Sequence, residues 1–144
     1  MTTEEKRLAI VEKARSLVGI PFVHLGRTRD GLDCAGLVLL SLSETVGVDM
    51  SCDTEYPQMF ETGFVFRNVN RIAKRVQQRD ALPGDIVVMN FSGRSTHLGI
   101  LAGATVIHAD SKVGRVVEET TDKSEIIAVH KHRVVAVYTA FGVN

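Results

Sequence analysis

The chain has 144 residues, which fits one compact domain (1–144) with a sizeable buried core. Its 17 basic and 17 acidic side chains cancel, so charge gives no reason to expect nucleic-acid or acidic-membrane binding. The longest apolar run, at 36–40, is far too short to span a bilayer, and the N-terminus lacks the apolar core of a signal peptide. We therefore expect synthesis in the cytoplasm, no membrane insertion, and delivery by another route for any role outside the cell.

The first predicted element is a helix that begins near Thr2, where Thr2 and Glu5 have the spacing of a capping box. Apolar side chains then recur at helical spacing at Leu8, Val11, Ala14, Leu17 and Val18. Gly19 and Pro21 should end this helix.

The segment 20–33, IPFVHLGRTRDGLD, has the composition of a loop, with glycines at 26 and 31. A second helix is predicted from Asp33 to Val46, closing at Gly47. Six apolar residues leave it almost no polar face, so it should be central and buried: Ala35, Leu37, Val38, Leu39, Leu40 and Leu42.

Residues 51–82 carry the weakest pattern, with a short helix expected at 57–61 and helix or strand at 70–78. The sequence LPGD at 82–85 predicts a type II turn. Five short β-branched segments follow, at 86–91, 97–102, 105–110, 114–119 and 133–141. Helices first and an antiparallel meander of about five strands afterwards indicate an α+β fold.

Cys34 stands between the glycine-marked loop and the buried helix. The first turn of a helix carries unpaired N–H groups and a partial positive charge, which favour a thiolate and can hold an oxyanion. The small neighbours Ala35 and Gly36 should leave room for a substrate. Cysteine is nevertheless among the most buried residue types, so Cys34 taken alone is better interpreted as a structural thiol.

A nucleophilic thiol needs a base, and two of the five histidines lie in adjacent predicted strands. An even-length loop at Gly103–Ala104 would make paired residue numbers sum to 207, which puts His97 diagonal to His108 on one face. An odd-length loop would put the two rings on opposite faces. With both rings on one face, His97 can take the Cys34 proton while His108 orients the His97 ring.

Other interpretations of these residues stay open. Cys34, His97 and His108 could in principle ligate zinc, although no closely spaced ligand pair supports a metal, and we expect no metal or cofactor. Cys52 is expected to be a passive thiol, and a bridge between it and Cys34 remains an alternative. His130 and His132 fit a solvated edge, and Asp110 fits a turn more than a partner of His108.

The sequence GIPFVHLGRTRDGLDCAGLV, followed by PGDIVV, THLGIL and VIHA, resembles the NlpC superfamily of papain-like cell-wall cysteine endopeptidases. The likeness runs from about residue 9 to residue 138, and it is weakest between 50 and 80. The variety with GRTRDGLDCAGLV resembles domains found among phage tail genes. The resemblance implies a papain-like α+β fold with N-terminal helices packed on the C-terminal sheet.

By the same resemblance, Cys34 matches the nucleophile, His97 the base and His108 the orienting residue. The implied reaction is hydrolysis of an amide in peptidoglycan stem peptides, typically between D-γ-glutamate and a diamino acid. The implied partners are peptidoglycan peptides and phage tail proteins, and a tail would deliver the enzyme to the bacterial cell wall.

Two positions depart from the family pattern. Phe22 stands where members commonly carry a tyrosine that assists at the oxyanion, and Ala35 stands where serine is frequent. His24 could replace the missing donor or be a surface-loop residue, and Asp33 should cap the helix and line the cleft. These departures keep one alternative open, a catalytically weak tail-assembly or wall-binding module. A related papain-like acyltransferase or deamidase is a third hypothesis.

Overall fold

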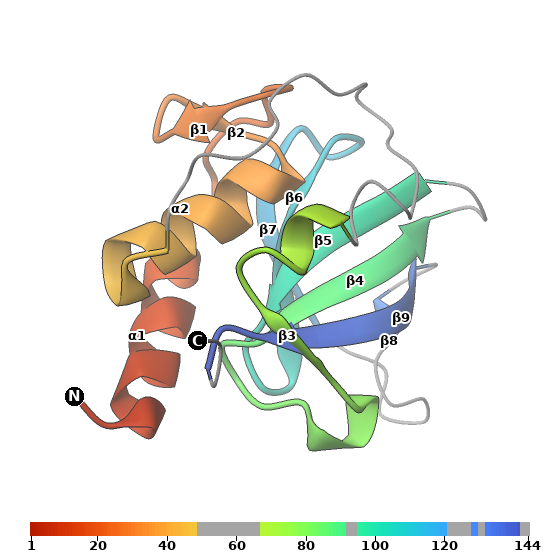
Figure 1. The fold of residues 1–144 in the computed structure, drawn as a ribbon. Coiled ribbons are helices and arrows are strands. Elements are labelled where there is room, and N and C mark those ends of the chain that lie inside the picture. Colours follow the sequence, from red (N-terminus) through yellow and green to blue (C-terminus); the bar gives the residue numbers. More distant parts are fainter. Residues whose placement is uncertain (49–66, 92–94, 121–127, 130–131, 142–144) are drawn as a thin grey trace.

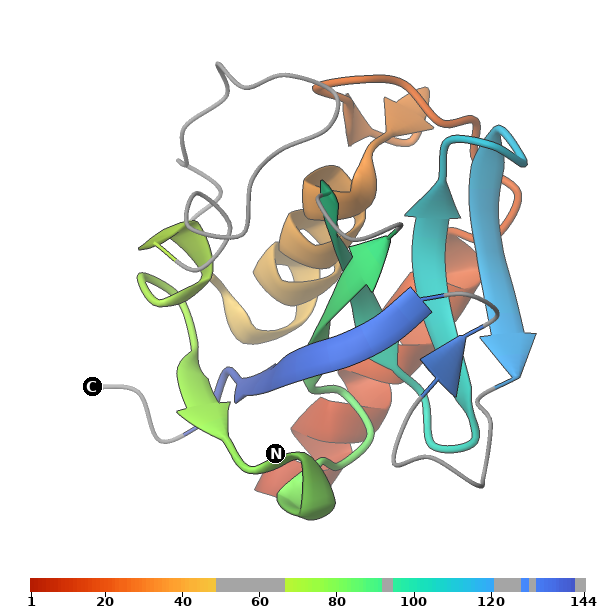
Figure 2. The same cartoon turned by 90° about the vertical axis from the view of Figure 1, so that its right-hand side faces the viewer.

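The computed structural model describes residues 1–48, 67–91, 95–120, 128–129 and 132–141. Two helices lie on one side of an antiparallel sheet of seven strands, as Figures 1 and 2 show from two directions. The strand order is β3-β9-β4-β5-β6-β7, and β8 pairs with β9 beside this path. The expected order of helices first and an antiparallel sheet afterwards is confirmed.

Helix α1 spans Thr3–Ser16 and begins with the predicted capping box between Thr2 and Glu5. Its buried face is formed by Ile10, Val11 and Ala14, with Leu17 following at the C-cap. The expected stripe was wrong for Leu8 and Val18, which are 57% and 43% exposed. At about 3.6 residues per turn, Leu8 lies on the opposite side of the helix from Ile10.

The segment 20–33 is more ordered than a loop, because it contains the hairpin of β1 (Arg27–Thr28) and β2 (Gly31–Leu32). Helix α2 spans Cys34–Val46, with Asp33 as N-cap and Gly47 closing it in the left-handed region at a φ of 74°. The bounds predicted for this helix are confirmed, and so is its burial at Gly36 and at all positions from 37 to 42. Ala35 is the exception, because it is half-buried.

Strand β3 (Lys74–Val76) and the short 3-10 helix η1 (Gln78–Asp80) resolve the ambiguous segment 70–78 as strand at its centre. The helix expected at 57–61 lies outside the described residues. The five predicted strands are confirmed as β4 (Ile86–Phe91), β5 (Ser95–Leu101), β6 (Thr105–Asp110), β7 (Arg115–Thr120) and β9 (His132–Thr139). Strand β3 and β8 (Ala128–Val129) add two short strands to the expected five.

Both faces of the sheet are apolar. The face toward the helices joins the main core, which includes Leu37, Leu98 and Ile107. The opposite face carries a smaller buried cluster of Val87, Met89, Leu101, Val106, Val134 and Val137. None of the helices in the described residues is long and apolar enough to cross a membrane.

The predicted type II turn at 82–85 is confirmed and connects the sheet to α1. Asp85 N–H donates to Leu82 O at 3.0 Å, and Gly84 has the φ of 93° that this turn requires. The buried Asp85 carboxylate accepts from Leu82 N–H at 2.9 Å and from Arg7 Nη1 at 2.6 Å. Arg7 Nη2 also donates to Thr139 Oγ1 at 3.0 Å, so one guanidinium ties α1 to β4 and β9.

Replacing Asp85 by alanine should lower the free energy of unfolding by about 3–5 kcal/mol, because it leaves the Arg7 charge without its buried partner. Chemical denaturation followed by circular dichroism measures this change. The matched control is Glu44→Ala, which removes the exposed ion pair of Glu44 with Arg29 and should change the unfolding free energy little. Equal effects of the two substitutions would contradict the role assigned to Asp85.

Candidate active site

The register of the β5–β6 hairpin places the two candidate histidines together. Ile100 pairs with Ile107 and Leu101 with Val106, so paired residue numbers sum to 207 as an even-length loop requires. His97 and His108 therefore project from the same face. Their rings meet edge to face, with Nε2 of His97 lying 2.8 Å from Nδ1 of His108.

Gly99 lies between the two histidine positions, and its missing side chain leaves space that the neighbouring strand enters. A Cβ at Gly99 would lie 2.7 Å from Val106 Cγ1 and 3.3 Å from His108 Cβ. The neighbouring strand therefore already fills this space. Gly99 allows β6 and the His108 ring to approach β5 closely.

Cys34 is the first residue of α2 and lies against β5 beside His97. The backbone N–H of Leu98, the residue that follows His97, hydrogen-bonds the Cys34 sulfur. Cys34 and His108 are 5% and 0% exposed, whereas His97 is only half-buried. The fold thus brings the two imidazoles together on β5 and β6 and sets the Cys34 sulfur against the backbone of β5, and His97 is the half-buried member of the three.

The environment of Cys34 favours the protonated thiol over the thiolate. Burial, and secondarily the negative charge of Asp33, raise the pKa of the Cys34 thiol to about 12. The N–H groups of Leu98 and Ala35 and the positive charge of Arg27 lower this pKa by less. The first-turn N–H groups, which we expected to favour a thiolate, therefore lower the pKa of Cys34 by less than burial raises it.

A buried thiol can still act as a nucleophile if its proton leaves during the attack. Nε2 of His97 is engaged with His108, so Nδ1 is the ring nitrogen that could accept the proton from Cys34. This is general-base assistance by His97 and needs no thiolate in the resting state.

Asp33 caps α2 as predicted. Its Oδ1 accepts from Gly36 N–H at 2.8 Å and from Arg27 Nη1 at 2.7 Å, and its Oδ2 accepts from Leu25 N–H at 3.0 Å. The carboxylate is buried and joins the helix start to the β1–β2 hairpin. Its contact with a substrate stays a prediction.

Gly36 has a packing role that differs from the expected one. A Cβ at this position would overlap the backbone carbonyl of Gly26, so the absent side chain admits the loop and leaves no space for a substrate. The half-buried Ala35 packs against the main core at the same helix end.

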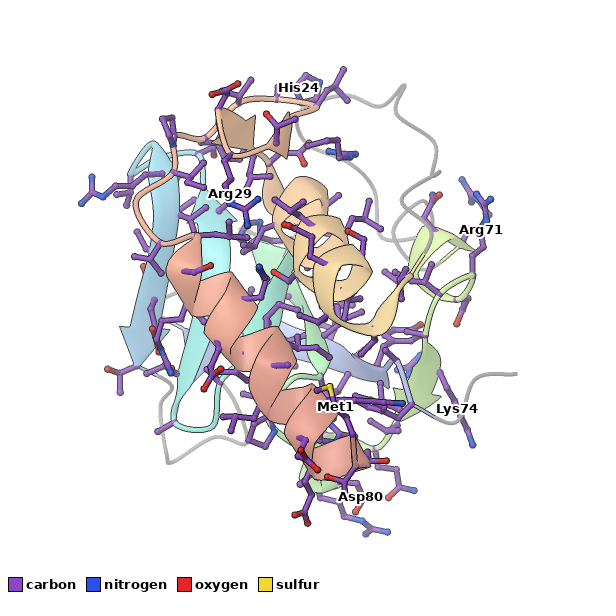
Figure 3. The ribbon with its side chains drawn as sticks, turned by 90° about the vertical axis from the view of Figure 1, so that its left-hand side faces the viewer. Met1, His24, Arg29, Arg71, Lys74 and Asp80 are labelled. Carbon is purple, nitrogen blue, oxygen red and sulfur yellow. The ribbon has the colours of Figure 1, made fainter. Side chains whose placement is uncertain are left out.

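The remaining cleft candidates lie on the loop before α2. Phe22 is half-buried against the main core, its backbone bridges Leu32, and its N–H donates to Gly114 O at 2.9 Å. His24 is half-buried. It lies on the turn that precedes β1, where Figure 3 labels it. The roles suggested for Phe22, His24 and Ala35 at the oxyanion or the substrate stay predictions.

Sequence reasoning missed Glu119, which lies on β7 beside the histidine pair. Its Oε2 is 3.5 Å from Nε2 of His108. His108 pairs with Val117 and Val106 pairs with Glu119, so His108 and Glu119 are diagonal neighbours on one face. The parity of the turn at 111–114 was the signal that could have found this residue.

The zinc hypothesis named a set of ligands that differs from the one the structure brings together. Among the described residues, the metal-capable set with ligand atoms within 4.8 Å of one another is His108, Asp110 and Glu119. Asp110 also forms the predicted turn, because its Oδ1 accepts from Lys112 N–H at 2.8 Å. This set shares only His108 with the expected ligands.

Cys52, His130 and His132 are the remaining cysteine and histidines of the sequence. Cys34 is a free thiol, and Cys52 and His130 lie outside the described residues. His132 begins β9.

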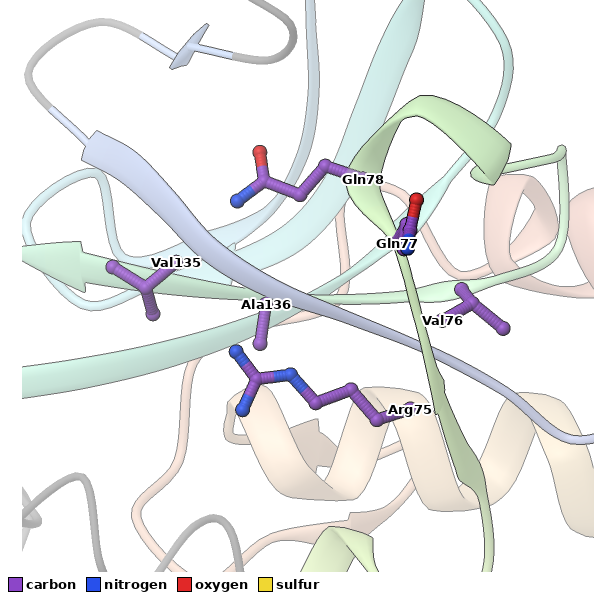
Figure 4. Close-up of a pocket in the computed structure, with 6 residues that line it drawn as sticks. All are labelled: Arg75, Val76, Gln77, Gln78, Val135 and Ala136. Atoms are coloured by element: carbon purple, nitrogen blue, oxygen red, sulfur yellow. The ribbon is translucent and has the colours of Figure 1, made fainter.

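A surface pocket lies between β3 and β9, lined by Arg75, Val76, Gln77, Gln78, Val135 and Ala136 (Figure 4). It is separate from the cysteine and the histidine pair.

Asp33→Asn should lower the pKa of Cys34, because asparagine keeps a capping oxygen but removes the nearby negative charge. The rate of alkylation by iodoacetamide, followed across alkaline pH by mass spectrometry of the Cys34 peptide, measures this shift. Wild-type Cys34 should react slowly at neutral pH, and Asp33→Asn should react faster at every pH.

Arg27→Gln is the matched control for this experiment. It removes the positive charge that lowers the pKa of Cys34, so alkylation should become slower. Reaction of Asp33→Asn at the wild-type rate or below it would contradict the electrostatic assignment.

Solved structures share this fold at low sequence identity. The NlpC/p60 domain of the peptidoglycan hydrolase SagA is 22% identical over 79% of this chain and 88% of that chain, with a TM-score of 0.60. The P60 domain of the M. avium subspecies paratuberculosis antigen MAP1204 is 19% identical over 94% of each chain, with a TM-score of 0.63. NlpC1 from Trichomonas vaginalis is 16% identical over 97% of this chain, with a TM-score of 0.71, and this chain covers 45% of it.

These likenesses confirm the expected α+β, papain-like fold. No curated protein sequence matches the chain. The family model of NlpC/P60 matches residues 19–135, which include Cys34, His97 and His108. Because this match covers most of the sequence, the chain belongs to the NlpC/P60 family.

Proposed function

We propose that this protein is a cysteine endopeptidase that hydrolyses amide bonds in peptidoglycan stem peptides, at the D-γ-glutamyl–diamino acid bond. The observation that carries the proposal is the 2.8 Å contact between His97 and His108 beside the first residue of α2, Cys34. A thiol, a base and a group that orients the base are the parts that nucleophilic amide hydrolysis requires.

In the first half of the proposed reaction, His97 Nδ1 takes the proton from Cys34 as the sulfur attacks the carbonyl carbon. The resulting tetrahedral intermediate carries an oxyanion. Asp33 occupies the Gly36 N–H, and Leu37 N–H donates to Asp33 O at 2.9 Å. The Ala35 N–H already hydrogen-bonds the Cys34 sulfur, so the N–H of Cys34 is the group that the first turn of α2 can offer to negative charge.

The second half of the reaction restores the enzyme. His97 gives its proton to the departing amine as the carbon–nitrogen bond breaks, which leaves a thioester on Cys34. A water molecule, deprotonated by His97, attacks this thioester, and the thiolate leaves and recovers its proton. The products are a peptide with a new amine and a peptide with a new carboxylate.

The same proposal places the protein at the bacterial cell wall as a phage tail-associated enzyme, with tail proteins as partners. Its support is the resemblance of GRTRDGLDCAGLV to domains found among phage tail genes. Copurification of the protein with tail particles would support this location. Absence of the protein from purified virions would contradict the location.

A catalytically weak module on the same fold is the second candidate. Two observations favour it, the 5% exposure of Cys34 and the position of Phe22 where a tyrosine is common in the family. Such a module would bind cell-wall peptides or tail proteins without efficient turnover.

Mass spectrometry of muropeptides before and after incubation tests these candidates together. The wild-type protein should release new free amines at one bond, and Cys34→Ala should abolish the release while leaving the circular dichroism spectrum unchanged. His97→Ala should reduce turnover by roughly 10²–10⁴-fold, because it removes the general base.

Two results would redirect the proposal. Binding of the wild-type protein to peptidoglycan with no release from several wall types would contradict the endopeptidase and support the module. An added amine acceptor should remain unincorporated during hydrolysis, and incorporation as the main product would identify an acyltransferase instead.

A further inference from the structure

Either histidine can be the donor in the hydrogen bond between His97 and His108. His97 Nε2 can donate to His108 Nδ1, or His108 Nδ1 can donate to His97 Nε2, and both arrangements fit the 2.8 Å separation. Only the first arrangement suits the proposed reaction. A neutral His97 that donates from Nε2 has an unprotonated Nδ1, which is the atom that must accept the Cys34 proton.

The required arrangement imposes a condition on His108. If its Nδ1 accepts from His97, a neutral His108 must carry its proton on Nε2. His108 is fully buried, so this N–H needs an acceptor within the protein. The direction of the pair is thus set by the group that faces Nε2 of His108.

Glu119 is the group at that position. Its Oε2 lies 3.5 Å from His108 Nε2, and its side chain is 15% exposed. A carboxylate is an acceptor only, so it can stabilise N–H at Nε2 but cannot donate to this nitrogen. At this separation the structure forms no hydrogen bond between the two atoms, which lie at an ion-pair distance. The proposed bond requires them to approach more closely, as catalytic groups commonly do when substrate binds.

The other ionisable groups around His108 are less suited to this task. Asp110, at the end of β6, accepts through Oδ1 from the N–H groups of Lys112 and Val113, and its neighbour across the β6–β7 pair is Arg115. His97 faces Nδ1 from β5. Glu119 is the carboxylate paired in space with Nε2.

We propose that Glu119 is a positioning residue that fixes the proton arrangement of the catalytic pair through His108. The resulting chain of hydrogen bonds runs from His97 Nε2–H to His108 Nδ1 and from His108 Nε2–H to Glu119 Oε2. It leaves His97 Nδ1 as an acceptor for the thiol proton. The inference rests on the proposed function and extends it to a residue on a third strand.

The wild-type protein provides the first test, without substrate and without mutation. The ¹⁵N NMR shifts of a histidine ring distinguish protonated from unprotonated nitrogens. At a pH where both rings are neutral, His97 and His108 should each carry the proton on Nε2. A proton on Nδ1 of either ring would overturn the proposal, whether or not the protein hydrolyses peptidoglycan.

Glu119→Leu provides the second test, because leucine removes the acceptor. We expect a mixture of His97 tautomers in the ¹⁵N spectrum and a fall in kcat of at least roughly tenfold, with a smaller change in KM. Glu119→Gln keeps an acceptor oxygen and should retain the His97 tautomer and most of kcat. Unchanged tautomers and unchanged kcat in Glu119→Leu would refute the role of Glu119.

The matched control is Glu118→Gln, on the adjacent position of β7. Glu118 accepts from Arg15 and Thr105, and its bond with Arg15 lowers the pKa of its carboxyl. This substitution removes the same charge from the same strand but should leave the His97 tautomer and kcat unchanged. A loss equal to that of Glu119→Leu would assign the effect to the strand and would contradict the hydrogen-bond chain.

The proposed function and the role of Glu119 would be contradicted by different results. Absence of hydrolysis with Nε2–H on both rings would contradict the proposed function and leave the proton arrangement intact. Hydrolysis with unaltered tautomers in Glu119→Leu would support the proposed function and contradict the role of Glu119. If Glu119→Leu does not fold, Glu119→Ala also removes the acceptor, and unchanged tautomers with unchanged kcat in that variant would equally refute the role of Glu119.

Discussion

The register of one hairpin is the constraint on which the candidate site depends. Strands β5 and β6 are paired so that His97 and His108 share a face, and a shift by one residue would separate their rings. The β6–β7 register then brings Glu119 to the far side of His108. Three consecutive strands thus provide the proposed base and two groups behind it, and only the proposed nucleophile comes from a helix.

The position of the nucleophile shows a balance between packing and reactivity. Cys34 belongs to the main core, and this burial raises the pKa of its thiol more than the nearby N–H groups lower it. A resting thiol resists oxidation and alkylation better than a thiolate does. Its activation then depends on His97 having the correct nitrogen unprotonated, which makes the proton arrangement of the histidine pair more important than it would be for a preformed ion pair.

Patterns among neighbouring residues in the sequence were sufficient to predict most of the fold. The Thr2 capping box, the Asp33 cap and the turn before Asp85 each depend on residues within four positions, and each is confirmed. Contacts between distant segments were beyond this reasoning. The pairing of β3 with β9 and the burial of the Cys34 sulfur depend on which elements pack together.

The residues that carried the family resemblance divide into two kinds once their contacts are known. Gly36 admits the Gly26 carbonyl, Asp33 holds the hairpin to α2, and Asp85 holds α1 to the sheet. These residues maintain the fold and would be required even in a protein without activity. The part of the motif that could take part in catalysis is therefore much smaller than the whole motif. A binding module could keep nearly all of it, so the proton arrangement around His97 is more informative about catalysis than the motif itself.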